Sequence, residues 1–539
     1  MKRLPIGKQD FAAIRKQNLL YVDKTKQIYE LINQADLYFL SRPRRFGKSL
    51  LLSTLGQLFK GNSDLFEGLY IEEQTNYEWE TFPVLHFNFA DYGYQVTYLE
   101  SALNNQITAY SEAFGVIIPY KELSERFTYL VQQIAKKNKP VVILIDEYDK
   151  PIVDFLTQLP QAQENQLILR RFFSPLKGLE AQGHLRFLFI TGVSKFSHVS
   201  LFSDLNNLKD LTLSILANDL VGITQPELVF YFEDYIKRAA NAFKMTEKEL
   251  LQGVKLWYDG YSFDGITRLY NPFSLLNFFS ENRFRNFWFA TGTPTFLVKA
   301  IQEQYVNPID LEYKEVTEAF FNKFSIEKLE ITGLLFQTGY LTIKEAILQG
   351  YETTYVLGYP NIEVRKSFIY NLLEAFTFKS HSIVGSALIK MERGLQQGNV
   401  AVFIDELKVL FSDMAYHLLP KAKKLPTKKE AAQNFRAWEG YFHTVIYLIT
   451  SFMGLQVQSE IAKHKGRLDL VAQTEKFIYL MEFKLDEPAS NAIEQIRNRE
   501  YTAAYQQTSK TLILVGINFS KNDRNVATWE SEFWKTEKK

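Results

Sequence analysis

Four largely apolar runs in the first 215 residues constrain the fold of this chain more than any other feature. They occupy residues 38–40, 84–89, 141–145 and 186–190. Runs with so few polar residues are typical of strands buried on both faces of a sheet, and amphipathic helical stretches separate them. This alternation of strands and helices predicts an α/β domain built on a mostly parallel sheet over residues 1–215.

Beyond residue 215 the strand pattern gives way to helical periodicity, and we expect a mostly helical middle or lid region over residues 216–418. Residues 420–429 contain five lysines and two prolines. Such a segment cannot bury a core, so we place a basic linker at 419–432. Residues 433–539 are expected to form a second, smaller α/β domain. Its expected elements are a helix at 433–453, several strands, a helix near 490–507 and a final strand at 511–517.

Composition excludes several classes of site. The chain has no cysteine, which excludes disulfides, cysteine-ligated zinc, iron–sulfur clusters and thiol catalysis. The chain has 62 Lys and Arg against 61 Asp and Glu, a formal net charge of +1. This charge is too small to attract nucleic acid or membranes to the whole molecule, so any such contact must be local. We see no signal peptide, and the longest apolar stretch, 445–455, is far shorter than the ~20 residues of a membrane span. We expect a cytoplasmic protein without membrane contact.

The segment after the first apolar run has the pattern of a phosphate-binding loop. Gly-Lys-Ser stands at 47–49, and a helical pattern begins directly after it. In such a loop, backbone N–H groups at the helix N-terminus face the phosphates, the lysine reaches the β- and γ-oxygens, and the serine holds Mg²⁺. The full pattern has glycine where this chain has Arg42, and a Cβ there restricts the loop. The expected nucleotide-binding residues are Arg45, Phe46, Gly47, Lys48, Ser49 and Leu50.

Two acids that follow the run 141–145 strengthen this interpretation. Asp146 and Glu147 would lie at the carboxyl end of a parallel strand, where open α/β sheets bind ligands. Asp146 is the expected Mg²⁺ ligand, together with Ser49, and Glu147 the expected base that polarises the attacking water. The alternative is a polar turn that ends a strand. Thr191 ends another strand and is a candidate for sensing the γ-phosphate, although a plain turn is equally consistent.

Four segments together resemble the bacterial AAA-ATPase-like family. They are Tyr-Val-Asp-Lys-Thr at 21–25, Arg-Pro-Arg-Arg-Phe-Gly-Lys-Ser at 42–49, Ile-Asp-Glu-Tyr-Asp at 145–149 and Thr-Gly-Val-Ser-Lys-Phe-Ser at 191–197. The resemblance covers residues 4–215 and implies an AAA-like P-loop NTPase fold. That family also accepts arginine at the position of Arg42. Its members usually carry a C-terminal nuclease-like domain of the PD-(D/E)XK superfamily, which implies a restriction-endonuclease-like α/β fold.

The expected nuclease-like domain contains two strand patterns, at 466–471 and 477–484, separated by a short polar turn. If the turn is a two-residue hairpin loop at 475–476, Asp469 lies opposite Glu482. Side chains alternate along a strand, so Lys484 shares their face.

Two carboxylates so close together repel each other unless a cation lies between them, which predicts a Mg²⁺ site at Asp469 and Glu482. Lys484 would orient or deprotonate the attacking water and stabilise charge on the phosphate. The alternative is a cross-strand salt bridge on a solvated face, which the apolar character of the second strand disfavours.

The resemblance to the PD-(D/E)XK superfamily implies further site residues. Glu439, on the first helix of the domain, would be an additional metal ligand, and Glu460 is a weaker candidate. Gln495 would lie near the active centre, although a solvated helix residue is nearly as consistent. We expect His443 and His464 to be structural.

Our leading hypothesis is an ATP-binding and ATP-hydrolysing P-loop protein coupled to a Mg²⁺-dependent nuclease that cleaves nucleic acid, DNA in the first place. The absence of cysteine favours oxygen-ligated Mg²⁺ at both sites. The alternative is a regulatory or sensing NTPase whose nuclease-like domain binds nucleic acid or a protein partner without cleavage. A third hypothesis is a DNA-processing factor of a mobile element or defence system, which would have the same chemistry and a different biological role. The sequence leaves a homo-oligomer open.

Overall fold

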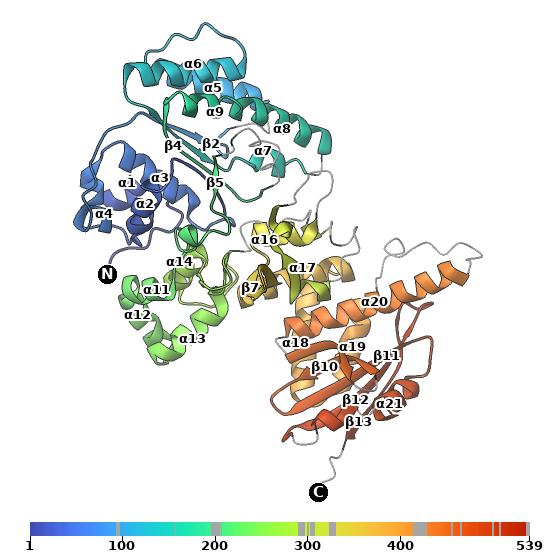
Figure 1. The fold of residues 1–539 in the computed structure, drawn as a ribbon. Helices are drawn as coiled ribbons and strands as arrows, with labels where there is room; N and C mark the ends of the chain where they lie inside the picture. Colours follow the sequence, from blue (N-terminus) through green and yellow to red (C-terminus); the bar gives the residue numbers. More distant parts are fainter. Residues whose placement is uncertain are drawn as a thin grey trace. The chain divides into compact units, whose positions relative to one another are not determined.

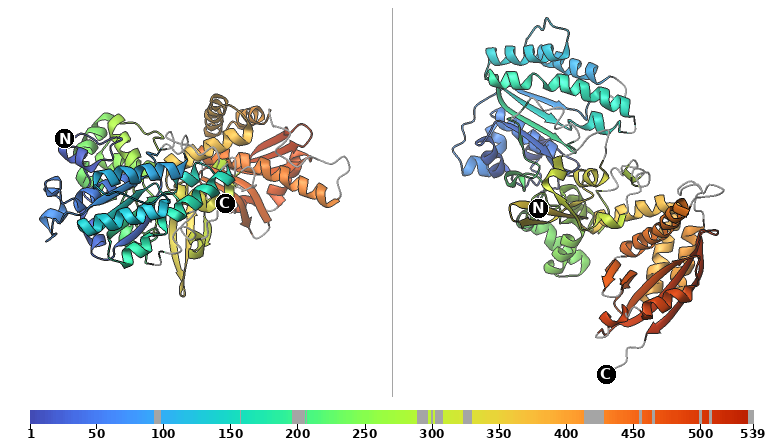
Figure 2. Two further views of the ribbon diagram at one scale, coloured as in Figure 1. Left: turned by 90° about the horizontal axis from the view of Figure 1, so that it is seen from above. Right: turned by 45° about the vertical axis from the view of Figure 1, so that its right-hand side comes forward.

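Two compact units make up the chain in the computed structural model. The first comprises Met1–Thr293 with Tyr313–Val364, and the second comprises Pro294–Glu312 with Arg365–Lys539. Figures 1 and 2 show their elements as ribbons. The residues that the structure describes are 1–92, 98–156, 158–195, 205, 207–288, 297–298, 301, 308–322, 330–412, 428–453, 456–463, 466–498, 501–505 and 508–534.

A five-stranded parallel sheet with the order β2-β3-β4-β1-β5 forms the centre of the first unit. The four strands predicted from the apolar runs are confirmed, and so is their parallel arrangement. β1 and β3 are buried along their whole length, whereas β2 alternates in exposure because it lies at the edge of the sheet. The strands are β1 (Leu37–Ser41), β2 (Val84–Asn88), β3 (Val141–Asp146), β4 (Leu185–Gly192) and β5 (Lys209–Asp210).

Helices cover both faces of this sheet. Figures 1 and 2 show α1 to α4 on one side and α5, α6, α8 and α9 on the other. The bounds are α1 (Phe11–Lys16), α2 (Thr25–Ile32), α3 (Lys48–Phe59), α4 (Tyr70–Glu73), α5 (Leu99–Ala113), α6 (Leu123–Lys137), α7 (Lys150–Val153), α8 (Leu159–Phe173) and α9 (Leu176–Ala181).

The middle region contains helices, as predicted, and also a three-stranded antiparallel sheet with the order β6-β8-β7, which we did not predict. The sequence of β7 is apolar at 343, 346, 347 and 348 and so lacks the alternation that marks a strand. The elements are α11 (Gln225–Tyr231), α12 (Glu233–Phe243), α13 (Glu247–Tyr258), α14 (Pro272–Glu281), α16 (Ile331–Thr338), β6 (Lys314–Thr317), β7 (Thr342–Gln349) and β8 (Glu352–Gly358).

The second unit contains a five-stranded sheet with the order β13-β12-β11-β10-β9, in which only β11 and β12 are parallel. α21 packs against β11 and β12, and α20 packs against β9, β10 and β11. The elements are α17 (Ile362–Thr377), α18 (His381–Gln396), α19 (Val400–Phe411), α20 (Lys428–Phe452), α21 (Ala489–Asn498), β9 (Gln456–Lys463), β10 (Gly466–Gln473), β11 (Phe477–Leu485), β12 (Thr511–Ser520) and β13 (Asn525–Trp534).

The predicted α/β character of the C-terminal part is confirmed, with differences in detail. The strand at 511–517 is not the last strand of the sheet, because β13 follows as an edge strand with half of its side chains exposed. The predicted helix 433–453 begins earlier, at Lys428. The expected linker 419–432 therefore overlaps α20, and its first part, 419–427, lies outside the described residues.

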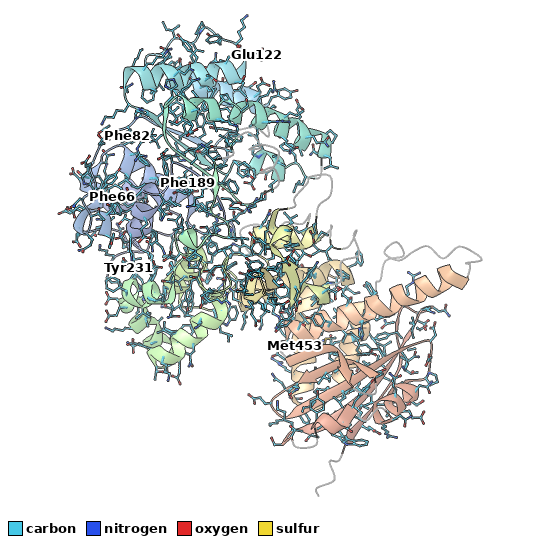
Figure 3. The ribbon with its side chains drawn as sticks, viewed as in Figure 1. Phe66, Phe82, Glu122, Phe189, Tyr231 and Met453 are labelled. Carbon is cyan, nitrogen blue, oxygen red and sulfur yellow. The ribbon has the colours of Figure 1, made fainter. Side chains whose placement is uncertain are left out.

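Aromatic side chains supply much of the core of the first unit. Phe87, Phe127 and Phe172 are fully buried, with ring centroids 4.6–5.7 Å apart. Phe66 and Phe189, labelled in Figure 3, are also fully buried. Core packing thus accounts for part of the aromatic content. Within the described ranges, we find no helix with the length and apolar character needed to cross a bilayer.

Candidate nucleotide and nuclease sites

The phosphate-loop segment connects β1 to α3, as the sequence predicts. β1 ends at Ser41 and α3 begins at Lys48, with Gly47 as the residue that caps the helix. Gly47 has a φ of +98°, a conformation that glycine adopts without steric cost. The tight turn brings the unbonded N–H groups of the first turn of α3 to the end of the sheet, where they can bind an anion.

Arg42, where the usual pattern has glycine, is a buried structural residue that is 1% exposed. Its guanidinium donates to the carbonyls of Ser41 and Thr212, both at 2.8 Å, and of Ala217 at 2.9 Å. It also lies 3.9 Å from the ring centroid of Phe263. Burial lowers the pKa of Arg42 to about 9. We expected the Cβ of Arg42 to restrict the conformation of the loop. Arg42 has no positive φ, so its backbone conformation does not require glycine.

Lys48 is the first residue of α3, and its side chain is buried. Its Nζ donates to the carbonyls of Arg42 at 2.9 Å and Pro43 at 3.0 Å. Burial lowers the pKa of Lys48, and the nearby charges of Asp146 and Glu147 oppose that shift. The ammonium group is thus hydrogen-bonded to the loop and close enough to the acids at the end of β3 to interact with their charges.

Asp146 and Thr191 meet at the ends of two neighbouring strands, β3 and β4. The Thr191 hydroxyl donates to Asp146 Oδ1 at 2.6 Å, and the N–H of Glu147 donates to the same oxygen at 3.0 Å. Asp146 is 1% exposed, and its Oδ2 has no hydrogen-bond partner within the described part of the chain. A buried carboxylate oxygen without a donor is suited to a cation.

Glu147 and Ser49 lie near this end of the sheet on separate elements. Glu147 is half-buried with a φ of +51°, an unusual conformation for a residue with a Cβ. Burial raises the pKa of its carboxyl. Ser49 is the second residue of α3 and is half-buried.

The sequence analysis missed the role of Asp149. Its carboxylate accepts from the N–H groups of Val193 and Ser194 and from the Ser194 hydroxyl, at 2.6–3.2 Å. These bonds fix the segment that follows β4. Gly192 must be glycine, because an added Cβ would lie 2.6 Å from both Asp149 Oδ1 and the Tyr148 ring. The sequence did offer a signal for this role, because Asp149 is the third acid of the motif at 145–149.

An apolar cavity of about 100 Å³ adjoins the phosphate loop. Gly47 and Leu50 line it together with residues from two other segments, near 20–28 and 220–232. Phe46 is also in its wall and is fully buried, packing edge-on against Tyr261 at 4.9 Å. Sequence reasoning missed this cavity because its walls come from segments about 200 residues apart.

In the second unit, the hairpin of β10 and β11 has the predicted register. Leu470 pairs with Met481, and the chain reverses through a two-residue loop at 475–476. The pairing ends at Leu470, and the same register continued by one residue would set Asp469 opposite Glu482. Asp469 Oδ2 accepts from the N–H of Phe483 at 2.8 Å.

Glu482, Lys484 and Gln495 form one hydrogen-bonded group. Glu482 is 2% exposed, and its Oε1 accepts from Gln495 Nε2 and lies 3.7 Å from Lys484 Nζ. Lys484 in turn donates to Gln495 Oε1 at 2.6 Å. Gln495, on α21, thereby contacts both charged side chains of β11.

His443 is nearer to this group than we expected. Its Nε2 lies 3.5 Å from Asp469 Oδ1, and its ring packs edge-on against Phe483. The side chains of Glu439 and Glu460 lie outside the described residues. Across the described side chains, no group of three or more acids or histidines is arranged to hold a metal ion.

Comparisons with known proteins agree with this architecture. A family model described as "Predicted AAA-ATPase" matches residues 5–202, and one described as "PD-(D/E)XK nuclease superfamily" matches residues 437–529. A protein of Azotobacter chroococcum mcd 1, with the name "Uncharacterized protein in vnfD 5'region", is 36% identical over 531 residues, which cover 97% of this chain and 98% of that protein. No solved structure matches. The resemblance noted in the sequence is thus confirmed, and the chain belongs to the family of AAA-ATPase-like proteins that carry a C-terminal PD-(D/E)XK nuclease superfamily domain.

Proposed function

We propose that this chain binds and hydrolyses ATP at the phosphate loop. We also propose that it cleaves phosphodiester bonds of nucleic acid at the β10–β11 hairpin, with DNA as the preferred candidate substrate. The observation that carries the proposal is the group formed by Glu482, Lys484 and Gln495 beside Asp469. A structural salt bridge on a solvated face would not require a nearly fully buried glutamate. Burying a charge is costly, so such a group is a functional-site candidate.

At the phosphate loop, each residue has a distinct role in the proposal. The first N–H groups of α3 and the Lys48 ammonium bind the phosphate oxygens. Ser49 and Asp146 would hold Mg²⁺, and the Asp146 oxygen that has no partner among the described residues supports that fit. Glu147 accepts a proton from the attacking water, because burial makes its carboxylate a stronger base than an exposed one. Thr191 orients Asp146 by its hydrogen bond.

At the hairpin, Asp469 and Glu482 would hold Mg²⁺, which would activate water and neutralise charge on the scissile phosphate. Glu439 is a further proposed ligand. Lys484 lies at hydrogen-bonding distance from Gln495 and can donate to a phosphate oxygen or the attacking water. Gln495 holds the lysine and Glu482 in a fixed relationship, which lowers the cost of ordering them during the reaction.

A regulatory NTPase that binds nucleic acid without cutting is the second candidate. It is favoured by one observation: across the described side chains, no group of three or more acids or histidines is arranged to hold a metal ion.

The experiment that separates the two uses the full chain with labelled single- and double-stranded DNA and RNA. Samples contain Mg²⁺ or EDTA, each with and without ATP. We expect Mg²⁺-dependent cleavage of at least one substrate. Binding of a substrate without cleavage, under every condition, would favour the regulatory protein.

A further inference from the structure

The cavity beside the phosphate loop has two walls that come from different parts of the first unit. One wall is the N-terminal segment, including Tyr21, Val22 and Lys24, and the other is the segment 220–223 with Phe232. Most of the lining is apolar, which suits a flat heterocycle rather than a phosphate. Lys24 is the charged side chain in the lining.

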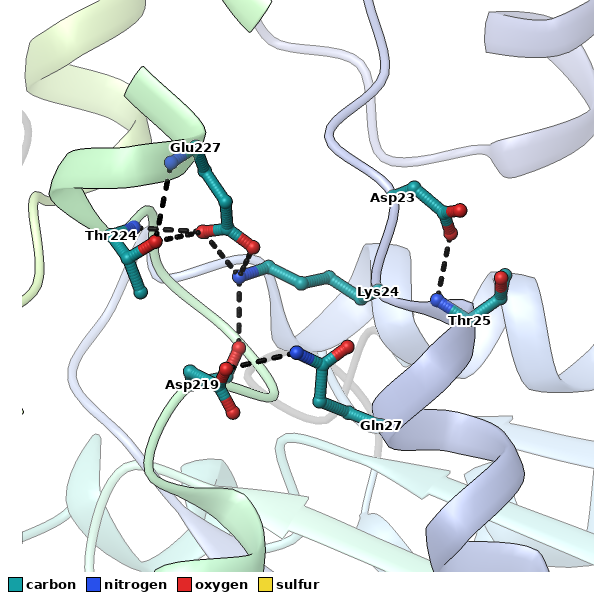
Figure 4. Close-up of polar contacts among 7 residues, drawn as sticks. All are labelled: Asp23, Lys24, Thr25, Gln27, Asp219, Thr224 and Glu227. Atoms are coloured by element: carbon teal, nitrogen blue, oxygen red, sulfur yellow. Dashed lines mark hydrogen bonds and ion pairs between the residues drawn. The ribbon is translucent and has the colours of Figure 1, made fainter. Parts of the chain in front are cut away.

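Lys24 joins the two walls through an ion pair with Glu227, the third residue of α11 (Figure 4). Its Nζ donates to both carboxylate oxygens of Glu227, at 2.6 and 2.8 Å, and to the carbonyl of Asp219 at 2.8 Å. The side chains of Lys24 and Glu227 are 10% and 16% exposed. An ammonium group has three donors, and these three contacts use them, so Lys24 ties the walls together rather than binding a ligand itself.

Each partner of the pair is fixed to its own wall. Glu227 belongs to a capping box in which its Oε2 accepts from the N–H of Thr224 at 2.8 Å and from the Thr224 hydroxyl at 3.0 Å. On the other wall, Asp23 accepts from the N–H of Thr25 and from the N–H of Tyr70, both at 2.8 Å. The ion pair therefore connects two segments that each have local hydrogen bonds of their own.

A second bond spans the same gap. Gln27 Nε2 donates to Asp219 Oδ2 at 2.9 Å (Figure 4). Asp219 thus receives hydrogen bonds from the N-terminal segment at both its backbone carbonyl and its side chain. The two walls also pack together through apolar side chains, because Leu20, Ile223 and Phe232 belong to one core cluster. The polar contacts are directional, so they fix the spacing of the walls more sharply than this packing alone would.

We infer that Lys24 and Glu227 are positioning residues, which hold the two walls at the spacing at which the cavity takes the base and ribose of the nucleotide. This inference rests on the proposed function, because it requires that the phosphates bind at the loop. The inference makes different predictions for the two parts of the nucleotide. Loss of the ion pair should lower the affinity for the nucleoside part and leave the affinity for the phosphate chain unchanged.

The test compares ATP with inorganic tripolyphosphate, which has the phosphate chain but no nucleoside. Both are titrated, with Mg²⁺, as competitors of a fluorescent ATP analogue on the full-length chain. In the double variant Lys24→Met/Glu227→Gln, we expect the affinity for ATP to fall at least tenfold and that for tripolyphosphate to change less than twofold. Partial unfolding lowers both apparent affinities by the same factor, so the ratio of the two affinities reports the walls alone.

Glu233→Gln is the matched control. Glu233 pairs with Lys237 on the neighbouring helix α12, but this pair is exposed, at 65% and 51%, and should leave both affinities unchanged. Equal losses for ATP and tripolyphosphate in the double variant, or no loss for either, would overturn the inference while the wild type still binds ATP. A wild type that binds neither ligand would instead overturn the proposed nucleotide site itself.

Discussion

Thr191 at the end of β4 donates a hydrogen bond of 2.6 Å to Asp146 at the end of β3, across two neighbouring strands of the parallel sheet. This bond orients a carboxylate that is almost completely buried. It shows how the sheet positions the candidate nucleotide site: the two strands end side by side, and the polar residues that follow their apolar runs meet.

Replacing Thr191 by valine keeps the shape of the side chain and removes this hydrogen bond. Because Asp146 is buried and charged, we expect the free energy of unfolding to fall by about 1–3 kcal/mol, measured by urea denaturation. Thr128→Val is the matched control, since the Thr128 hydroxyl donates to the backbone carbonyl of Ser124 within its own helix, α6. Its loss leaves no carboxylate without a donor, so the stability of that variant should stay within about 0.5 kcal/mol of the wild type. Equal losses in the two variants would contradict the role of the bond.

Arg42→Gly restores the glycine of the usual loop pattern, and we nevertheless expect it to destabilise the protein. Three backbone carbonyls would lose a buried donor, so the loss should be about 3 kcal/mol or more in the same denaturation experiment. Arg45→Gly in the same loop is the control, because Arg45 has a φ of +67°, which glycine adopts more easily. An Arg42→Gly protein as stable as the wild type would show that these bonds are dispensable.

Gly192→Ala tests the close packing after β4. The added methyl group would lie 2.6 Å from Asp149 Oδ1 and from the Tyr148 ring, which forces a shift that should cost about 1–3 kcal/mol. The same change at Gly178 in α9 meets no atom within 4 Å and should be neutral or slightly stabilising. Thermal melting of both variants measures the difference, and a Gly192→Ala protein that melts with the wild type would argue against the contact.

Glu363 makes the stability of the first unit depend on pH. It is fully buried and accepts from the N–H groups of Phe287 and Trp288 and from the Ser274 hydroxyl. Burial raises its pKa from 4.5 to about 7. The folded protein therefore holds this proton more tightly than the unfolded chain, and the resulting stability is fully present below about pH 4.5 and is lost as the pH rises through 7.

The Glu363→Gln variant keeps an acceptor and does not titrate. We expect its melting temperature to fall less than that of the wild type between pH 5 and pH 8. Melting curves recorded across that range provide the measurement. If the two proteins lost stability in parallel, the buried carboxyl would not be the source of the dependence.

The sequence was sufficient for the features that depend on local patterns. The strands of the parallel sheet were predicted from largely apolar runs, and the register of the β10–β11 hairpin followed from strand alternation and a two-residue loop. These features were accessible because each is decided within about 20 residues of chain.

Features that depend on distant partners were not predicted. Arg42 was interpreted as a departure from the loop pattern, because its carbonyl partners Thr212 and Ala217 lie about 170 residues further along the chain. The same distance hid the partner of Lys24, which is Glu227. His443 lies beside Asp469 only because α20 packs against β10.

The most direct test of the account measures ATP hydrolysis and Mg²⁺-dependent cleavage of nucleic acid on the same preparations of wild type, Lys48→Ala and Asp469→Ala. We expect the Lys48→Ala protein to lose ATP hydrolysis and still to bind metal at the hairpin. We expect the Asp469→Ala protein to lose cleavage and still to bind and hydrolyse ATP. Undiminished cleavage by the Asp469→Ala protein would contradict the assignment of the β10–β11 hairpin as a nuclease site.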